Sequence, residues 1–254
     1  MSSVVDRFQA IIGKLAPSLN KVWAICRKEL AVYFSSPVAY IVAAVFLLFS
    51  GYFFSVVLSY TRDASLRLLF QNVAIVMLLV APMLTMRLFA EERKLGTFEL
   101  LITSPLRISE LVAGKFLGAI ILFLAIMGVT LEYPLILVIY GEPDWGPMVT
   151  AYLGFILMGT SFMAIGMFAS SLTDNQIVAV VASFGILLFM WIIGWASDLI
   201  PSAAISMFVR SISIIDRFES FSKGILDSGD LVYYLSVIGT FIFLTIRSLD
   251  WRRW

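Results

Sequence analysis

The chain has 254 residues, of which 61% are hydrophobic and 14% are charged, and its formal net charge at pH 7 is +1. Soluble globular domains average about 45–50% apolar and about 25% charged residues. The apolar excess is gathered in long uncharged runs, which excludes a soluble enzyme, a disordered chain and a disulfide-stapled secreted domain. The composition therefore predicts an all-α, polytopic membrane protein.

The residue inventory also limits the chemistry of the chain. Histidine, the commonest metal ligand and the usual acid–base group at neutral pH, does not occur in the sequence. The single cysteine, Cys26, cannot form an intramolecular disulfide or a thiolate cluster. We therefore expect no catalytic centre, no metal site and no cofactor in this chain, and the net charge of +1 gives no indication of nucleic-acid binding.

Six segments approach or exceed the length of about 20 apolar residues that a membrane-spanning helix needs. They are residues 38–60, 68–86, 116–140, 147–173, 175–197 and 231–246, the last of which extends to 249. Of the 18 Lys and Arg residues, 13 lie in the N-terminal segment, in the loop between the second and third spans, or in the C-terminal tail. The positive-inside rule predicts that these three parts are cytoplasmic.

Residues 18–34, ahead of the first span, have the period of an amphipathic helix. Its apolar positions are Leu19, Val22, Trp23, Cys26, Leu30 and Tyr33. Charged residues fill the positions between them, so we expect this helix to lie flat on the cytoplasmic leaflet until Pro37 turns the chain into the first span. Two interpretations stay open, a simple membrane anchor and a docking element for a partner.

The loop at residues 87–115 is the most charged part of the chain. Its charged residues are followed by an apolar stripe of Phe98, Leu101 and Ile102, and Pro105 then ends the helix. A solvated connecting loop would hardly need such a stripe. We therefore interpret this loop as a small cytosolic helix that docks a partner protein.

The predicted external segment, residues 198–230, carries apolar residues at helical spacing, among them Phe218 and Phe221. This pattern indicates one or two short helices on the outer leaflet that end near Gly224. A gate or lid and a plain structured loop are equally compatible with the pattern.

One acidic residue, Glu132, falls within a predicted span. An intramembrane carboxylate indicates a role in transport or gating, although Pro134 opens the helix nearby and a position close to water is the alternative. Secondary transport is disfavoured, because the spans offer one acid, no buried base and no evident internal repeat.

Two pairs of small residues, Gly114 with Gly118 and Gly166 with Ser170, have a spacing that permits close helix packing and weakly favours self-association. The Gly114-Lys115 dipeptide lacks the preceding glycine and the following Ser or Thr of a phosphate-binding loop. Energy for any transport would therefore come from another polypeptide.

These features together resemble the membrane subunit of an ABC-2-type exporter, from about residue 20 to the C-terminus. The stretches that carry the resemblance are 22–30 (VWAICRKEL), 82–92 (PMLTMRLFAEE), 165–173 (IGMFASSLT) and 218–224 (FESFSKG). The combination is similar to the GldF-like (gliding-motility-type) branch.

The resemblance implies a six-span permease domain at 38–249 between cytosolic residues 1–37 and 250–254, in the bacterial cytoplasmic (inner) membrane. The chain would not be an enzyme by itself. Its expected partners are two copies of an ABC ATP-binding subunit, which bind ATP and Mg, and a second permease, identical or related. An auxiliary membrane subunit with a periplasmic domain is a further candidate partner.

The resemblance also assigns roles by position. The residues that would couple the chain to the ATPase are Arg87, Glu91, Glu92, Arg93, Gly96, Thr97, Phe98, Glu99, Leu101 and Ile102. The connecting helix would use Trp23, Arg27, Lys28 and Glu29. The candidates for translocation or gating are Glu132, Phe218 and Phe221. The rival interpretation is an ATP-independent scaffold or channel, and the cargo is left open.

Overall fold

The computed structural model describes residues 2–61, 65–103, 106–197, 200 and 202–251. Every regular element in these residues is an α-helix, and six stretches are long and apolar enough to cross a membrane. They are Pro37–Tyr60, Arg67–Lys94, Ile108–Tyr140, Trp145–Leu172, Gln176–Gly194 and Ser228–Trp251. The predicted all-α fold with six spans is confirmed.

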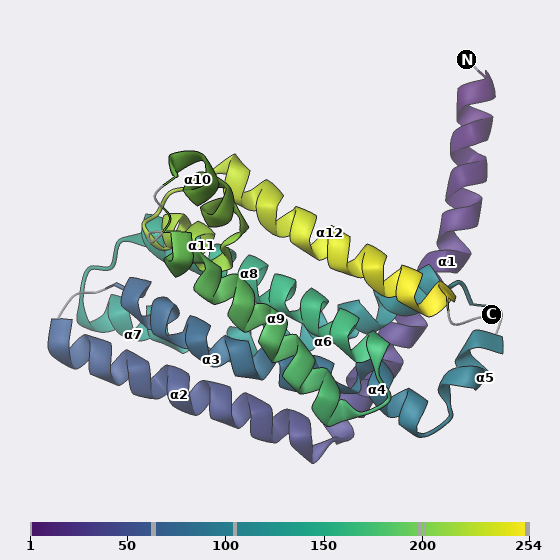
Figure 1. Cartoon of the computed structure of the whole chain (residues 1–254), viewed down its shortest axis with the longest axis horizontal. Helices are drawn as coiled ribbons and strands as arrows, with labels where there is room; N and C mark the ends of the chain where they lie inside the picture. The colour runs from purple at the N-terminus through teal and green to yellow at the C-terminus, as the bar shows by residue number, and fades with distance from the viewer. Residues whose placement is uncertain (1, 62–64, 104–105, 198–199, 201, 252–254) are drawn as a thin grey trace.

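Helix α8 (Trp145–Leu172) lies at the centre of the bundle (Figure 1). It packs against α3 (Arg67–Thr85), α6 (Ile108–Val129), α9 (Gln176–Ser197) and α12 (Ser228–Trp251). Small residues let its neighbours approach closely, since a Cβ at Gly159 would lie 2.5 Å from the ring of Phe123. Helices α2 (Pro37–Thr61), α9 and α12 lie at the edge and expose apolar side chains.

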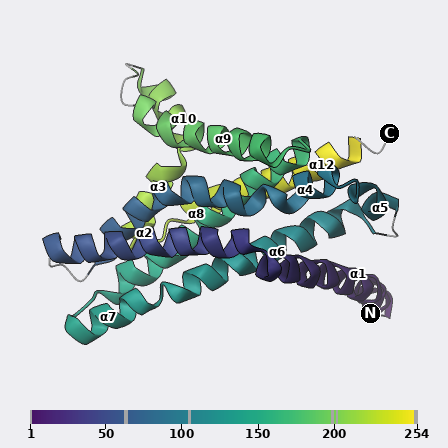
Figure 2. The ribbon, with the colours of Figure 1, turned by 90° about the horizontal axis from the view of Figure 1, so that it is seen from below.

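The remaining helices gather at the two ends of the bundle (Figures 1 and 2). Helices α4 (Arg87–Lys94) and α5 (Phe98–Thr103) lie at one end, together with α1 (Ser2–Ser35) and the end of α12. Helices α7 (Glu132–Tyr140), α10 (Ala203–Ile212) and α11 (Ile214–Ser222) lie at the other. We call these the α4–α5 end and the α10–α11 end. The grouping matches the predicted topology, and the side of the membrane that each end faces stays a prediction.

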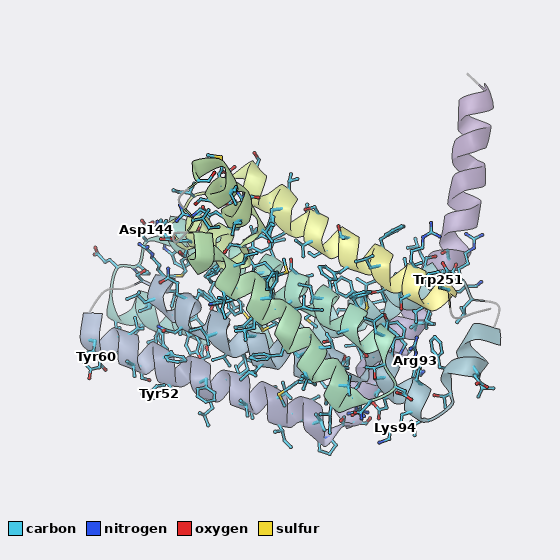
Figure 3. All side chains as sticks on the ribbon, viewed as in Figure 1. Tyr52, Tyr60, Arg93, Lys94, Asp144 and Trp251 are labelled. Carbon is cyan, nitrogen blue, oxygen red and sulfur yellow. The ribbon has the colours of Figure 1, made fainter. Side chains whose placement is uncertain are left out.

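Side chains follow the same division (Figure 3). Arg93, Lys94 and Trp251 lie at the α4–α5 end, whereas Asp144 lies at the opposite end. Tyr52 projects from the outer face of α2, where it is exposed. Aromatic and charged residues thus mark the places where the bundle would leave the bilayer.

The second and third spans are longer at the α4–α5 end than the sequence predicts. Helix α4 follows α3 after the single residue Met86, and α6 already begins at Ile108. The predicted loop 87–115 therefore shrinks to residues 95–107, which include α5. Charged residues do not end these helices, because most of them pair with a charge on the same or a neighbouring helix.

The third span is broken into α6 and α7 near Thr130, as Pro134 predicts. Proline has no N–H, so the carbonyl of Thr130 loses its usual helical donor. That carbonyl instead accepts the backbone N–H of Tyr133 (3.1 Å) and the hydroxyl of Tyr152 (2.7 Å). Glu132 lies in the first turn of α7 and is exposed on the bundle surface.

Candidate functional site

Helix α1 packs along α6 at Gly114 and Gly118, two of the three glycines of α6. A Cβ at Gly114 would lie 2.7 Å from the Cβ of Ile25, and one at Gly118 would lie 2.8 Å from the Cβ of Glu29. Only glycine permits this approach without displacing α1. The small-residue pair predicted for close packing therefore joins two helices of the same chain.

The face of α1 that meets α6 differs from the predicted apolar stripe. Cys26, Glu29 and Tyr33 are buried, whereas Leu19 and Trp23 are exposed. The helix is thus rotated so that a carboxylate points inward and part of the apolar stripe points outward. Such an orientation is stable only if the buried carboxylate has a partner.

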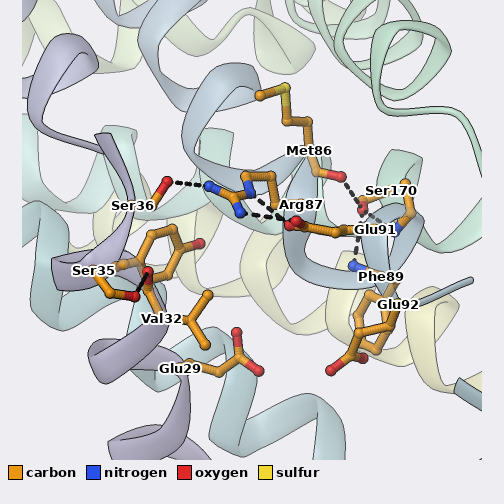
Figure 4. Close-up of polar contacts among 12 residues, drawn as sticks. Glu29, Val32, Ser35, Ser36, Met86, Arg87, Phe89, Glu91, Glu92 and Ser170 are labelled. Atoms are coloured by element: carbon orange, nitrogen blue, oxygen red, sulfur yellow. Dashed lines mark hydrogen bonds and ion pairs between the residues drawn. The ribbon is translucent and has the colours of Figure 1, made fainter. Parts of the chain in front are cut away.

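That partner is Lys115 of α6, whose side chain is 1% exposed. Its Nζ lies 2.7 Å from Oε1 of Glu29 and 2.9 Å from Oε1 of Glu92. One buried ammonium group therefore ties α6 to α1 and to α4, and Figure 4 shows the two carboxylates turned toward each other. This finding corrects the expectation of no buried base, which overlooked Lys115 because the predicted span began one residue later.

Arg87 forms a second link at the same junction (Figure 4). Its guanidinium donates two hydrogen bonds to the carboxylate of Glu91, one of them 2.8 Å long, and a third to the hydroxyl of Ser36. Lys28 lies 3.2 Å from Oε1 of Glu92. Together these groups surround a cavity of about 250 Å³ between α1 and α4, lined by three carboxylates and three cations. Predicted connecting-helix and coupling residues thus meet in one charge-balanced cluster.

A serine of α8 holds the junction between α3 and α4 (Figure 4). The Oγ of Ser170 donates to the carbonyl of Met86 (2.8 Å) and accepts the backbone N–H groups of Phe89 and Ala90 (both 3.1 Å). In a continuous helix the N–H of Ala90 would bond directly to the carbonyl of Met86. The buried hydroxyl of Ser170 therefore takes the place of a direct backbone hydrogen bond between Ala90 and Met86. This insertion explains the break in the second span.

Replacing Ser170 with alanine is expected to lower the free energy of unfolding by about 1–3 kcal/mol, because two buried N–H groups lose their acceptor. Unfolding in mixed micelles measures this loss. Ser171→Ala is the matched control, since within the described part of the chain the Ser171 hydroxyl bonds only to the carbonyl of Phe168 in its own helix. Equal losses for the two variants would show that the inserted hydroxyl does not hold the junction.

A tight turn at Gly96 connects α4 to α5. The φ of this residue is 70°, a conformation that favours glycine. Phe98 turns inward, against the ring of Phe89 at 6.4 Å and beneath the guanidinium of Arg93 at 5.1 Å. It therefore anchors α5 and does not belong to an outward docking stripe. The side chains of Leu101 and Ile102, the rest of that predicted stripe, lie outside the described residues.

Two leucines outside the predicted stripe are exposed here. Leu95 is 67% exposed and Leu100 is 72% exposed, and the side chain of Glu99 is also exposed beside them. A cleft of about 470 Å³ separates Glu99 and Gly96 from Asp174 in the turn between α8 and α9. The turn between α8 and α9 therefore borders the surface formed by α5 and the end of α4.

The other predicted site residues lie apart from this cluster. Trp23 and Arg27 are exposed on α1, and Glu132 lies at the far end of the bundle. Phe218 and Phe221 are fully buried, with the carbonyl of Phe221 accepting a hydrogen bond of 2.8 Å from Thr150. Helix α11 is therefore packed into the bundle, instead of resting on the outer leaflet.

At the α10–α11 end, ion pairs outside the spans connect α11 to the start of α3. Lys223 donates a hydrogen bond to Glu219, with Nζ 2.7 Å from Oε1, and Arg67 lies 3.6 Å from the same oxygen. The hydrogen bond from Lys223, aided by the positive charges around it, holds the pKa of the Glu219 carboxyl below its usual range. Glu219 thus stays ionised at neutral pH, and its pairing secures α11 against the start of the second span.

Six helices that are long and apolar enough to cross a membrane define a multi-pass membrane protein. Residues 23–245 match the family model described as ABC-2 family transporter protein, and the chain belongs to this family. It is a permease component of an ABC transporter, without an ATPase of its own, and the family pairs with an ABC ATP-binding subunit. No match was found among curated proteins.

Proposed function

We propose that this permease belongs to an exporter driven by two copies of a separate ATP-binding subunit, which hold the ATP and Mg, and that the α4–α5 segment docks on that subunit. The observation that carries the proposal is the exposed surface of Leu95, Glu99 and Leu100 on a segment continuous with the second span. Large apolar side chains that are exposed together at the end of a span are candidates for burial by a partner protein, with neighbouring charges at the rim of the contact.

The charge cluster supplies the mechanical link in this proposal. Closure of the ATPase pair presses on α5, and α4 passes the displacement directly to α3. Lys115 ties α4 to α1 and α6, so these helices move together. Because Phe218 and Phe221 are buried, a gating role for them requires α11 to move relative to α8.

The same proposal places the protein in the cytoplasmic (inner) membrane of a bacterium, with both termini in the cytoplasm. The excess of Lys and Arg at the α4–α5 end supports this orientation. A second permease, identical or related, would cover part of the exposed apolar faces of α2, α9 and α12. An auxiliary subunit with a periplasmic domain and the GldF-like branch stay part of the proposal on the resemblance alone.

The test combines Glu99→Arg with Leu100→Asp and asks whether the permease still co-purifies with its ATP-binding subunit. Reversing one exposed charge and replacing an exposed leucine should weaken assembly at least tenfold, on the order of a two-residue hot spot, and abolish ATP-dependent transport. Tyr140→Asp, an exposed position at the far end, is the control. Assembly and transport at wild-type levels in the double variant would contradict the docking assignment. Transport by the unsubstituted chain without any ATP-binding subunit would favour an ATP-independent scaffold or channel.

A further inference from the structure

A cleft of about 740 Å³ lies where α8 and α12 end, at the α4–α5 end of the bundle. Phe168, Leu172 and Leu244 form its apolar wall, and Arg247, Asp250 and Trp251 are its charged and amphipathic lining. Spans end at the membrane–water interface, which is where tryptophan and snorkelling arginine concentrate in membrane proteins. Apolar and charged side chains in one cleft match the two parts of a phospholipid, an acyl chain and a charged headgroup.

The charges of the cleft indicate which headgroup fits. Arg247 and Asp250 are three residues apart on a helix, which places their Cβ atoms about 5–6 Å apart. The guanidinium of Arg247 lies over the ring of Phe243, 5.2 Å from its centroid, and so points back along α12, away from Asp250. A ligand that carries an anion next to a cation therefore meets both charges in one pose.

We propose that this cleft binds a phosphatidylethanolamine molecule, with its phosphate on Arg247, its primary ammonium on Asp250 and an acyl chain along Phe168 and Leu244. A choline headgroup has no N–H to donate to Asp250, and a phosphoglycerol headgroup has no cation for it. Leu172 borders both this cleft and the one beside α5, so the lipid lies next to the proposed docking surface.

The test titrates the purified full-length chain in detergent with dioleoyl phosphatidylethanolamine, phosphatidylcholine or phosphatidylglycerol and measures retained lipid by native mass spectrometry. The ethanolamine lipid is expected to bind about fivefold more tightly than the other two, the size of one exposed charge pair. Asp250→Asn should remove its advantage over the choline lipid, and Arg247→Gln should weaken all three lipids. Glu142→Gln, an exposed change of the same kind at the far end, should alter nothing.

Three results would overturn the proposal. Equal binding of the ethanolamine and choline lipids would show that Asp250 does not select the headgroup. Tightest binding of phosphatidylglycerol would indicate a general site for anionic lipids. Efficient disulfide cross-linking of Trp251→Cys between two copies, in a Cys26→Ser background, would show that a second permease fills the cleft. None of these results bears on ATPase docking, so the two proposals fail separately.

Discussion

Replacing Lys115 with methionine is expected to lower the free energy of unfolding by about 3–5 kcal/mol, the usual loss when one member of a buried ion pair is removed. Glu29 would be left buried without the cation that pairs with it, and among the described residues Glu92 would keep only the exposed Lys28 as an ion partner. The measurement is an unfolding titration of the full chain in mixed micelles.

Two further variants separate lost pairing from lost packing. Lys28→Met removes a cation that is 55% exposed and should cost less than about 1 kcal/mol. Adding Glu29→Gln to Lys115→Met should recover about half of the loss, because the stranded charge is gone. If Lys115→Met costs no more than Lys28→Met, the buried cluster does not hold the three helices together.

Replacing Gly114 with valine is expected to lift α1 from α6 and to expose Cys26. The new Cβ would lie 2.7 Å from Ile25 Cβ and 2.8 Å from the backbone oxygen of Val22, which the helix cannot relieve by a rotamer change. Cys26 reports the movement, because it is fully buried and is the single cysteine of the chain. Labelling of Cys26 by N-ethylmaleimide at neutral pH should accelerate at least tenfold, because the substitution lowers the free energy needed to separate α1 from α6. Each 1.4 kcal/mol of that lowering raises the labelling rate about tenfold.

The native rate should be slow for two reasons. The thiol is covered by α6, and burial together with the nearby Glu29 carboxylate raises the pKa of Cys26, which lowers the thiolate fraction. Gly128→Val on the same helix is the control, because a Cβ there meets nothing within 4 Å. Rapid labelling of the unsubstituted chain, or equal rates in both variants, would contradict the packing of α1 on α6.

Features that depend on a short stretch of chain were predictable. Six apolar runs gave six spans, Pro134 marked the break in the third span, and Gly224, with a φ of 87°, closes α11 where expected. The two short helices before the sixth span also lie within the predicted segment. Each of these follows from hydropathy, periodicity or the backbone preference of one residue.

Features that depend on a partner on another helix were not predictable. Periodicity assigned Glu29 to the polar face of α1, and its true burial follows from Lys115, 86 residues away. The break at Met86 needs Ser170, more than 80 residues away, and nothing in the local sequence requires it. The sequence predicts an outward docking role for Phe98, because its inward partner, Phe89, lies on another helix. Pairing across helices decides all three positions, and one sequence does not reveal it.

Cross-linking from α5 tests most directly the central claim that the α4–α5 segment docks on the ATPase. A photoreactive amino acid at Leu100 is compared with one at Tyr60, an exposed position at the opposite end of the bundle, in membranes that contain the permease and its ATPase. The account predicts an ATPase adduct from Leu100 and none from Tyr60. An adduct from Tyr60 alone, or none from Leu100 in a complex that still transports with ATP, would contradict it.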